Sequence, residues 1–277
     1  MPELPEVELV VRSLQSLVVG RSVVRAEILR PRLIPGISSD EFGNLLKGRK
    51  IENVSRRGKF ILTTFDNNVT LITHLRMSGR FGYLPLEKAL PKFTHAVFYL
   101  DNEMRLVFSD QRHFGMMKIS QTNEIGGSGE LSKLGPEPFG EAFTADYLRS
   151  VMSSSRRSIK ETLLDQSRVV GLGNIYAAEV LFSARVRPTA PAAKLSRARI
   201  DRIREAILNT LRDAVANGST LRVDPENIDG SYYGGGFERQ WAVYDRENEP
   251  CHVCGSVIRR ITQGGRSTYF CPKCQRT

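Results

Sequence analysis

The chain begins Met1-Pro2-Glu3-Leu4-Pro5-Glu6-Val7-Glu8 and continues with apolar residues at helical spacing. This pattern predicts a helix over residues 3–19, which Gly20 ends. Removal of Met1 would leave Pro2 with a free secondary amine beside the Glu3 carboxyl. Such an amine can attack an electrophilic carbon and form an iminium, and a partly desolvated carboxyl can protonate a leaving oxygen. Taken by itself, the stretch is more often an ordinary helix start, because prolines and acids favour the first turn.

The residues after this helix change from helical to strand texture. Several short alternating segments between Val23 and about Ile119 predict a β-sandwich or barrel. Examples of these segments are Ser22–Leu29, Lys50–Arg56, Lys59–Phe65, Val69–Leu75, Ala96–Leu100 and Arg105–Ser109.

The second half of the chain has helical texture. A glycine- and proline-containing stretch at residues 120–142 predicts a linker between two domains. Beyond it, apolar spacing predicts helices over Ala145–Met152, Ser158–Leu164, Asn174–Ala184 and Ser196–Ala216. The fold class predicted from these patterns is α+β, with strands in the first domain and helices in the second.

Composition indicates a globular protein that binds a polyanion. Lys and Arg outnumber Asp and Glu by 40 to 30, which gives a net charge of +10 and a pI near 9.7. Such an excess favours nucleic acid, with an anionic membrane surface as the alternative. The N-terminus lacks a basic region followed by an apolar core, and no apolar run has membrane-spanning length. We therefore expect a cytoplasmic protein, without a membrane partner.

All four cysteines lie within the last 27 residues, in the pattern Cys251-x2-Cys254-x16-Cys271-x2-Cys274. This spacing is typical of a four-thiolate zinc site, and the missing export signal argues against two disulfides. Four thiolates leave no open coordination position, so one zinc ion would be structural. The same segment contains five Lys or Arg residues and no Asp or Glu, which indicates a surface that faces phosphates.

The opening Pro-Glu-Leu-Pro-Glu-Val-Glu, together with the cysteine pattern and the motifs below, resembles the formamidopyrimidine-DNA glycosylases of bacteria, which excise oxidised purines. The resemblance covers essentially the whole chain. It implies a catalytic β-sandwich domain with a leading helix at 1–125, a linker at 126–143, and a C-terminal zinc-finger β-hairpin at 237–277. Between them it implies a helix–two-turn–helix domain at 144–236, with a lesion-capping loop at 217–237.

The resemblance also implies a bifunctional glycosylase and strand-cleaving lyase. Pro2 would attack the sugar and Glu3 would protonate the ring oxygen. Lys59, which by itself could be a solvated lysine at a strand edge, would support cleavage of the sugar–phosphate linkage. Arg266 would bind phosphates beside the lesion and assist the second elimination. Neither a catalytic metal nor a redox cofactor is implied, and the enzyme would act as a monomer in the bacterial nucleoid.

Two segments match the family's intercalating turns, His74-Leu75-Arg76-Met77-Ser78-Gly79 and Ser109-Asp110-Gln111-Arg112-His113-Phe114-Gly115. An enzyme that flips a nucleotide must fill the gap left behind and support the orphaned base. By resemblance Met77, Arg112 and Phe114 do this, with Arg112 bonded to the estranged base, and His74 contacts DNA. Met77 and Phe114 would otherwise be assigned to the core.

Phosphate contacts are implied for a third segment, Val169-Val170-Gly171-Leu172-Gly173-Asn174, and for the helix before it. Amides at a helix start bind phosphate without a side-chain charge. Asn174 alone would be an ordinary helix cap, but by similarity it contacts the DNA backbone. Arg157 replaces a lysine that contacts DNA in the family, and Lys160 matches a basic position.

Three departures from the family pattern bear on DNA contacts. Phe93 stands where many relatives have a DNA-contacting histidine, and His113 replaces a more usual basic residue. The loop from Ser219 to Phe237 differs from the usual capping loop in length and sequence.

Three other functions remain open from the sequence. A relative that prefers oxidised pyrimidines would share the fold. A catalytically silent lesion-binding protein would share the DNA surface, although Pro2, Glu3 and Lys59 argue against it. For a general nucleic-acid-binding zinc protein, the first eight residues would be incidental.

Overall fold

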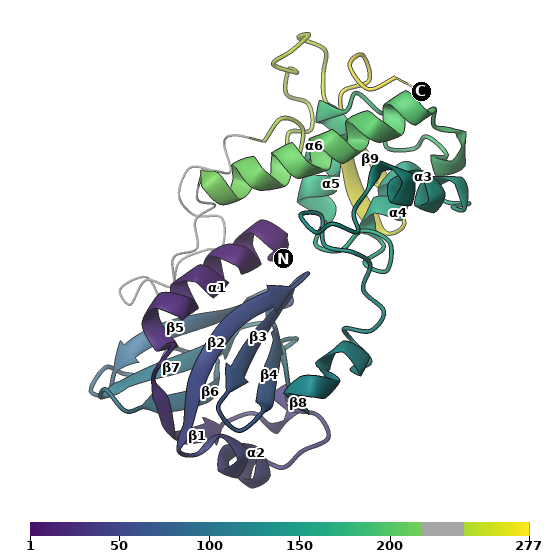
Figure 1. Ribbon diagram of the computed structural model, residues 1–277. Coiled ribbons are helices and arrows are strands. Elements are labelled where there is room, and N and C mark those ends of the chain that lie inside the picture. Colours follow the sequence, from purple (N-terminus) through teal and green to yellow (C-terminus); the bar gives the residue numbers. More distant parts are fainter. Residues whose placement is uncertain (218–240, 277) are drawn as a thin grey trace. The chain divides into compact units, whose positions relative to one another are not determined.

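The computed structural model describes residues 1–217 and 241–276, which form two compact units (Figure 1). The first unit holds Met1–Ser132. The second holds Lys133–Asn217 and the residues described from Trp241 onward. Apart from Asn217, the capping loop predicted at 217–237 lies outside the described residues. None of the described helices is long and apolar enough to cross a membrane.

The first unit is built from a leading helix and one antiparallel sheet of eight strands, in the order β5-β7-β6-β1-β2-β3-β4-β8. Its helical elements are α1 (Leu4–Val18), the 3-10 turn η1 (Pro31–Leu33), α2 (Ser39–Leu46) and η2 (Thr122–Gly127). Its strands are β1 (Ser22–Ile28), β2 (Arg49–Arg57), β3 (Phe60–Phe65), β4 (Val69–His74), β5 (Gly79–Pro85), β6 (Thr94–Leu100), β7 (Met104–Asp110) and β8 (Met116–Gln121).

The sheet is narrowest between β1 and β2, which pair only through Ser22 with Lys50 and Val23 with Arg49. Four strands lie on each side of this short ladder. Buried residues from every strand and from α1 nevertheless belong to one hydrophobic core. The α1 face in this core carries Val7, Val10, Val11, Leu14 and Val18, at the spacing that predicted the helix.

The second unit is helical and ends in a short hairpin (Figure 1). Its elements are α3 (Ala145–Ser153), α4 (Ile159–Leu164), α5 (Asn174–Ser183), η3 (Ala192–Lys194), α6 (Arg197–Ala216), β9 (Arg259–Gln263) and β10 (Arg266–Phe270). Gly264 and Gly265 connect the two strands with φ values of 53° and 73°. Both angles require a left-handed backbone, which glycine adopts without steric cost and which suits a two-residue hairpin turn.

The predicted α+β class, the leading helix and the C-terminal hairpin are confirmed. The four predicted helices of the second unit agree with α3 to α6 to within one residue at either end. Helix α2 was not predicted, although Ser38 accepts a hydrogen bond from the Glu41 N–H at 3.1 Å in an ordinary cap. Strands β5 and β8 were not among the segments named as examples, although β5 and most of β8 lie within the region predicted to form strands.

Gly115 occupies a position where any side chain would collide with the core. A Cβ atom there would lie 2.7 Å from Cζ of Phe108, which is fully buried. We expect Gly115→Ala to lower the free energy of unfolding by about 1–3 kcal/mol, as overpacking does. Chemical denaturation checks this, with Gly129→Ala as control because its added methyl meets nothing within 4 Å. Equal stability of both variants would contradict the packing argument.

Candidate active site

The start of the chain is held in place by its own first helical turn. The Glu3 N–H donates to the Glu6 carboxylate at 2.7 Å, and the two residues form a capping box at the start of α1. Both side chains are buried, and so is Pro2. A carboxylate in a first turn is further stabilised by the helix dipole. The terminal residues are therefore ordered, as a reacting group requires.

The terminal amine lies among charged side chains of the first unit. Here it belongs to Met1, and its burial lowers its pKa below the ordinary value of 8.0. The carboxylates of Glu3 and Glu6 oppose this shift, whereas the cations Lys59 and Arg112 lower the pKa further. A lowered pKa leaves more amine unprotonated at neutral pH, which is the form that can attack carbon.

Lys59 sits in the tight turn between β2 and β3, in which Arg57 pairs with Phe60. Gly58 supplies the positive φ of 58° that such a turn needs. Only 5% of Lys59 is exposed, although lysine is rarely buried. The position of Lys59 is therefore not that of a solvated strand-edge lysine. Its charge lowers the pKa values of both the terminal amine and His74.

His74, at the end of β4, is a neutral imidazole. Burial, assisted by the charges of Arg76 and Lys59, lowers its pKa to about 3. Its Nδ1 accepts the Arg76 N–H at 2.9 Å, so the ring proton is on Nε2. His74 can thus contribute a hydrogen-bond donor but no charge. The same bond holds the turn before Met77, where Arg76 has a φ of 56°.

The Asp110 carboxylate joins the two turns that carry Met77, Arg112 and Phe114. The Ser78 hydroxyl donates to its Oδ1, and the Gly115 N–H donates to its Oδ2 at 2.6 Å. Ser78 Oγ in turn accepts the Arg112 N–H at 2.9 Å. Asp110 is buried at the end of β7. The sequence interpretation did not identify this hydrogen-bonded link between the two turns, because Ser78 and Asp110 are 32 residues apart in the sequence.

Large side chains extend from these joined turns into solvent. Met77 is 39% exposed and Phe114 is 57% exposed, which excludes the core positions that their residue types suggest. The Arg112 guanidinium lies 5.3 Å from the Phe114 ring centroid, within cation–π range. A flexible apolar side chain, a ring and a planar cation are thus held together on adjacent turns.

A second set of predicted residues meets in the second unit, at the β10 strand. Lys160 is fully buried, and its ammonium donates to the Ser267 carbonyl at 2.8 Å and to the Thr268 hydroxyl at 2.7 Å. The Asn174 amide donates to the same Ser267 carbonyl at 3.0 Å. Arg266, the next residue toward the turn, is exposed. Lys160 therefore supports the strand that carries Arg266, and burial keeps its own ammonium from the surface of this unit.

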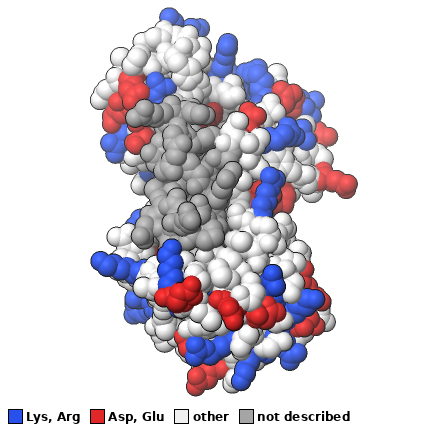
Figure 2. All heavy atoms as spheres, turned by 90° about the vertical axis from the view of Figure 1, so that its left-hand side faces the viewer, with Lys and Arg blue, Asp and Glu red and all other residues white. Residues whose placement is uncertain are grey.

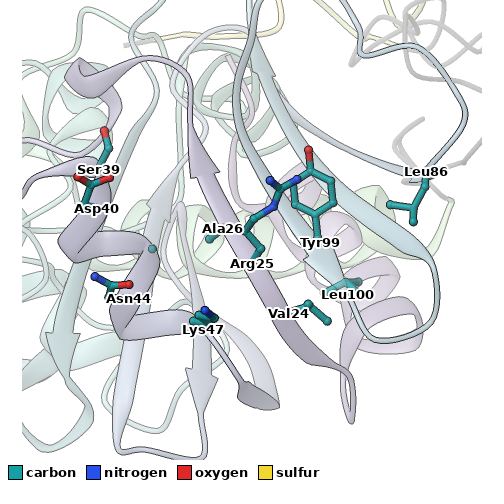
Figure 3. Close-up of a pocket in the computed structure, with 11 residues that line it drawn as sticks. Val24, Arg25, Ala26, Ser39, Asp40, Asn44, Lys47, Leu86, Tyr99 and Leu100 are labelled. Atoms are coloured by element: carbon teal, nitrogen blue, oxygen red, sulfur yellow. The ribbon is translucent and has the colours of Figure 1, made fainter.

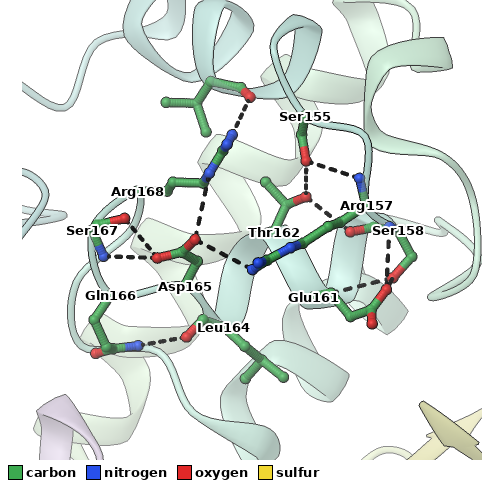
Figure 4. A network of polar contacts seen from close by, with 11 residues as sticks. Ser155, Arg157, Ser158, Glu161, Thr162, Leu164, Asp165, Gln166, Ser167 and Arg168 are labelled. Carbon is green, nitrogen blue, oxygen red and sulfur yellow. Dashed lines mark hydrogen bonds and ion pairs between the residues drawn. The ribbon is translucent and has the colours of Figure 1, made fainter. Parts of the chain in front are cut away.

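Arg157 is part of a polar network around Asp165 (Figure 4). The Asp165 carboxylate lies 3.5 Å from both the Arg157 and Arg168 guanidinium groups, and it also accepts two hydrogen bonds from Ser167. Although burial alone would raise the Asp165 pKa, these bonds and charges lower it. Arg157 remains largely exposed, so a phosphate can reach its guanidinium.

The glycine-rich turn before α5 is closed by Gln166. Its Oε1 accepts the Gly171 N–H at 3.0 Å, and its Nε2 donates to the Leu172 carbonyl at 2.8 Å. Gly171 has a φ of 93°, which accounts for glycine at this position. The turn thus delivers the chain to the α5 N-terminus in a fixed conformation.

The four cysteine thiols fit a tetrahedral zinc ion. Their Sγ atoms all lie within 4.8 Å of one another, and none forms a disulfide. The Cys251–Cys274 and Cys254–Cys271 sulfur distances are 3.9 and 3.4 Å. A tetrahedron with Zn–S bonds of about 2.3 Å needs sulfurs about 3.8 Å apart. The chemistry of the donors and their spacing both suit zinc.

Other surface features lie apart from these residues. A pocket of about 810 Å³ opens between α2 and strands β1 and β6, lined in part by Arg25, Lys47 and Tyr99 (Figure 3). None of the predicted site residues lines it. On the face drawn in Figure 2, acidic and basic side chains are interspersed, so the positive excess is not gathered there.

Comparison with family models divides the chain into three matching parts. Residues 1–117 match the formamidopyrimidine-DNA glycosylase N-terminal domain, and residues 134–224 match the H2TH domain of the same enzymes. Residues 248–277 match a zinc finger found in FPG and IleRS. Together with the cysteine geometry, this last match establishes one structural zinc site.

Full-length relatives and solved structures agree with the matches to the family models. The formamidopyrimidine-DNA glycosylase of Bacillus subtilis is 42% identical over 277 residues, covering 99% of both chains. That of Dinoroseobacter shibae is 43% identical over all of both chains. The Lactococcus lactis enzyme in complex with abasic-site DNA matches with a TM-score of 0.91 and 32% identity, over 99% of this chain and 100% of that one.

The zinc site should be needed for DNA binding, because it holds the hairpin on which Lys160 and Asn174 converge. In so short a module, metal binding supplies most of the free energy of folding. We expect Cys254→Ala, or chelation of the metal, to abolish measurable affinity for a duplex that contains an abasic-site analogue. The first unit should stay folded, and its protection from hydrogen exchange measures this. Val253→Ala is the matched control, since Val253 is exposed. Full affinity of protein shown to be metal-free by elemental analysis would contradict this.

Proposed function

Because this chain belongs to the formamidopyrimidine-DNA glycosylase family, we propose that it excises oxidised purines from duplex DNA with Pro2 as its nucleophile. The family assignment makes it a base-excision-repair glycosylase and AP lyase that acts on damaged DNA. The substrates proposed are 8-oxoguanine and formamidopyrimidines. The observation that carries the assignment of Pro2 is the ordered chain start, in which both Pro2 and Glu3 are buried.

In the proposed reaction, the Pro2 nitrogen loses its proton and bonds to the sugar C1′. The bond from C1′ to the base breaks, and the base leaves with the proton that the Pro2 nitrogen gave up. Glu3 donates a proton to the ring oxygen, and the bond from C1′ to that oxygen breaks to form the iminium. The resulting iminium makes the C2′ proton acidic, so its removal expels the 3′ phosphate and a second elimination expels the 5′ phosphate. Lys59 assists as a nearby cation, and Arg266 binds phosphate and assists the second step.

Glu6 has a different part from Glu3, although both are buried. Its carboxylate accepts the Glu3 backbone N–H, so it orients the chain start. His74, which is neutral, donates a hydrogen bond to DNA from Nε2 in this proposal. Neither residue needs to change its charge during the reaction.

The exposed turns of the first unit fill the gap left by a flipped nucleotide. Met77 and Phe114 insert into the base stack, and Arg112 bonds the estranged base. In the second unit, Arg157 and Asn174 contact phosphates. Lys160 acts through Ser267 and Thr268 by holding the strand of Arg266. The enzyme acts as a monomer on bacterial chromosomal DNA in the cytoplasm.

A second substrate class has one specific observation in its favour. A solved Lactococcus lactis enzyme, 32% identical to this chain, is bound to DNA that contains an oxidised pyrimidine. We therefore include oxidised pyrimidines as a candidate class beside the purines. Strand cleavage of matched duplexes, one with 8-oxoguanine and one with an oxidised pyrimidine, decides between a purine preference and a broad range.

Assignment of the nucleophile requires that Met1 be absent from the active form, because a Pro2 amide cannot attack carbon. Borohydride added during the reaction should trap an adduct that maps to Pro2, in protein whose intact mass lacks Met1.

The control is a variant with one additional residue before Pro2, which should bind lesion DNA and yield no adduct. An adduct at Lys59, or undiminished cleavage by the extended variant, would show that another group is the nucleophile.

Arg112 should discriminate between partner bases, whereas a phosphate contact should not. Arg112→Ala is expected to reduce the preference for cytosine over adenine opposite the lesion by about 1–3 kcal/mol, the usual contribution of a bidentate base contact. Arg276→Ala, an exposed cation of the second unit, should weaken binding evenly for both partners. Kd values for the two duplexes measure this, and the same pattern in both variants would remove Arg112 from base recognition.

A further inference from the structure

The turn between β9 and β10 is tied to the rest of the second unit by the Gln263 side chain. Gln263 ends β9, and its Nε2 donates to Ser158 Oγ at 2.7 Å and to the Pro188 carbonyl at 3.3 Å. Gln263 is also the residue of β9 that pairs with Arg266, so these two residues flank the two glycines of the turn. The Gln263 side chain therefore fixes the strand directly opposite Arg266.

Ser158 is itself held by the first turn of α4, of which it is the N-cap (Figure 4). Its hydroxyl donates to the Glu161 carboxylate at 2.6 Å, and its N–H donates to the same oxygen at 3.3 Å. Because the hydroxyl gives its only proton to Glu161, it accepts the bond from Gln263. The turn also lies against this carboxylate, since a Cβ atom on Gly264 would be 3.2 Å from Glu161 Oε1.

A separate pair of contacts holds the strand on the other side of the turn. Lys160 and Asn174 both donate to the carbonyl of Ser267, the residue after Arg266. These bonds fix β10, whereas the Gln263 bonds fix β9. A hairpin held on one strand alone can pivot about that strand, and a hairpin held on both cannot. The exposed side chain of Arg266 therefore extends from a main chain that is held on both sides.

We propose that Gln263 is a positioning residue for Arg266 and acts through the N-cap of α4. The inference rests on the proposed function, in which Arg266 binds phosphate and assists the second elimination. Loss of the Gln263 bonds frees β9, so the turn moves about β10 and the guanidinium is in place for a smaller fraction of the time. The second elimination depends on that placement, whereas excision of the base and the first elimination do not.

The kinetic test uses Gln263→Met, which keeps the length of the side chain and removes both donated hydrogen bonds. The full-length protein, in excess over a duplex with one 8-oxoguanine, is followed through a single turnover, and gels separate the products of the two eliminations. Base release and the first elimination should keep their rates. The second elimination should slow by about two- to tenfold, the effect of one net hydrogen bond. Elemental analysis should find unchanged zinc content.

A double-mutant cycle with Arg266→Gln decides whether Gln263 acts through Arg266. Its readout is Kd for a duplex with a tetrahydrofuran abasic analogue, which has no base to excise. We expect Gln263→Met to weaken binding by at most about tenfold in the otherwise unaltered protein. The same substitution should add nothing once Arg266 has been replaced.

Variants of two other residues test the route and its specificity. Ser158→Thr keeps the hydroxyl and should keep both the affinity and the rate of the second elimination. Ser158→Ala should reproduce the effects of Gln263→Met. Gln121→Met makes the same substitution at an exposed glutamine of the first unit and should change neither readout.

An unchanged rate of the second elimination in Gln263→Met would overturn the inference. Equal losses of affinity from Gln263→Met with and without Arg266 would also overturn it, because the effect would then not pass through Arg266. Failure of the proposed function would look different. The unaltered protein would then leave the 8-oxoguanine duplex intact, and the inference would fall with that function.

Discussion

The hydrogen bond from the Glu3 N–H to the Glu6 carboxylate is the constraint on which the active site depends. Chain termini ordinarily fray, whereas a nucleophile must be held in a reactive geometry. Here the bond closes the first turn of α1, and the apolar face of the same helix lies in the core of the first unit. Folding of the sheet therefore orders the chain start, and burial at that place also lowers the pKa of the Met1 amine. One packing arrangement accounts for both the position and the burial of these residues.

Each of the two units contains a buried lysine, Lys59 in the first and Lys160 in the second. A charged ammonium inside a protein needs oxygen acceptors or a functional reason. Lys160 has two acceptors on β10 and is a structural cation, although it resembles a DNA contact in sequence. Lys59, in the β2–β3 turn, lies where its charge reaches the terminal amine. The contrast shows that a buried lysine can hold a neighbouring strand in place, as Lys160 does, or act on a nearby group through its charge, as Lys59 does.

Features that depend on local spacing could be predicted from the sequence. The helix α1, the helices of the second unit and the cysteine cluster all follow from periodicity or from fixed intervals. Features that depend on distant partners could not. Asp110 forms a hydrogen bond with Ser78, which is 32 residues away in the sequence. Lys160 forms one with Ser267, which is 107 residues away. Helix α2 is a different case, because its cap at Ser38 is a local feature, but the helix has only eight residues and interrupts a region of strand texture.

The proposed DNA contacts are of two kinds, to phosphates and to the orphaned base, and they need different rigidity in the side chains that make them. Contacts to phosphates carry no direct sequence information and tolerate mobile cations, and the exposed Arg157 beside Asp165 is the cation proposed for such a contact. Recognition of an orphaned base requires the guanidinium in one place relative to the gap. In the proposed role, Arg112 meets this need through its main chain, because its N–H is bonded to Ser78, which Asp110 holds. Under the proposed function, discrimination between partner bases rests on the main-chain position of Arg112, which the buried Asp110 carboxylate holds through Ser78.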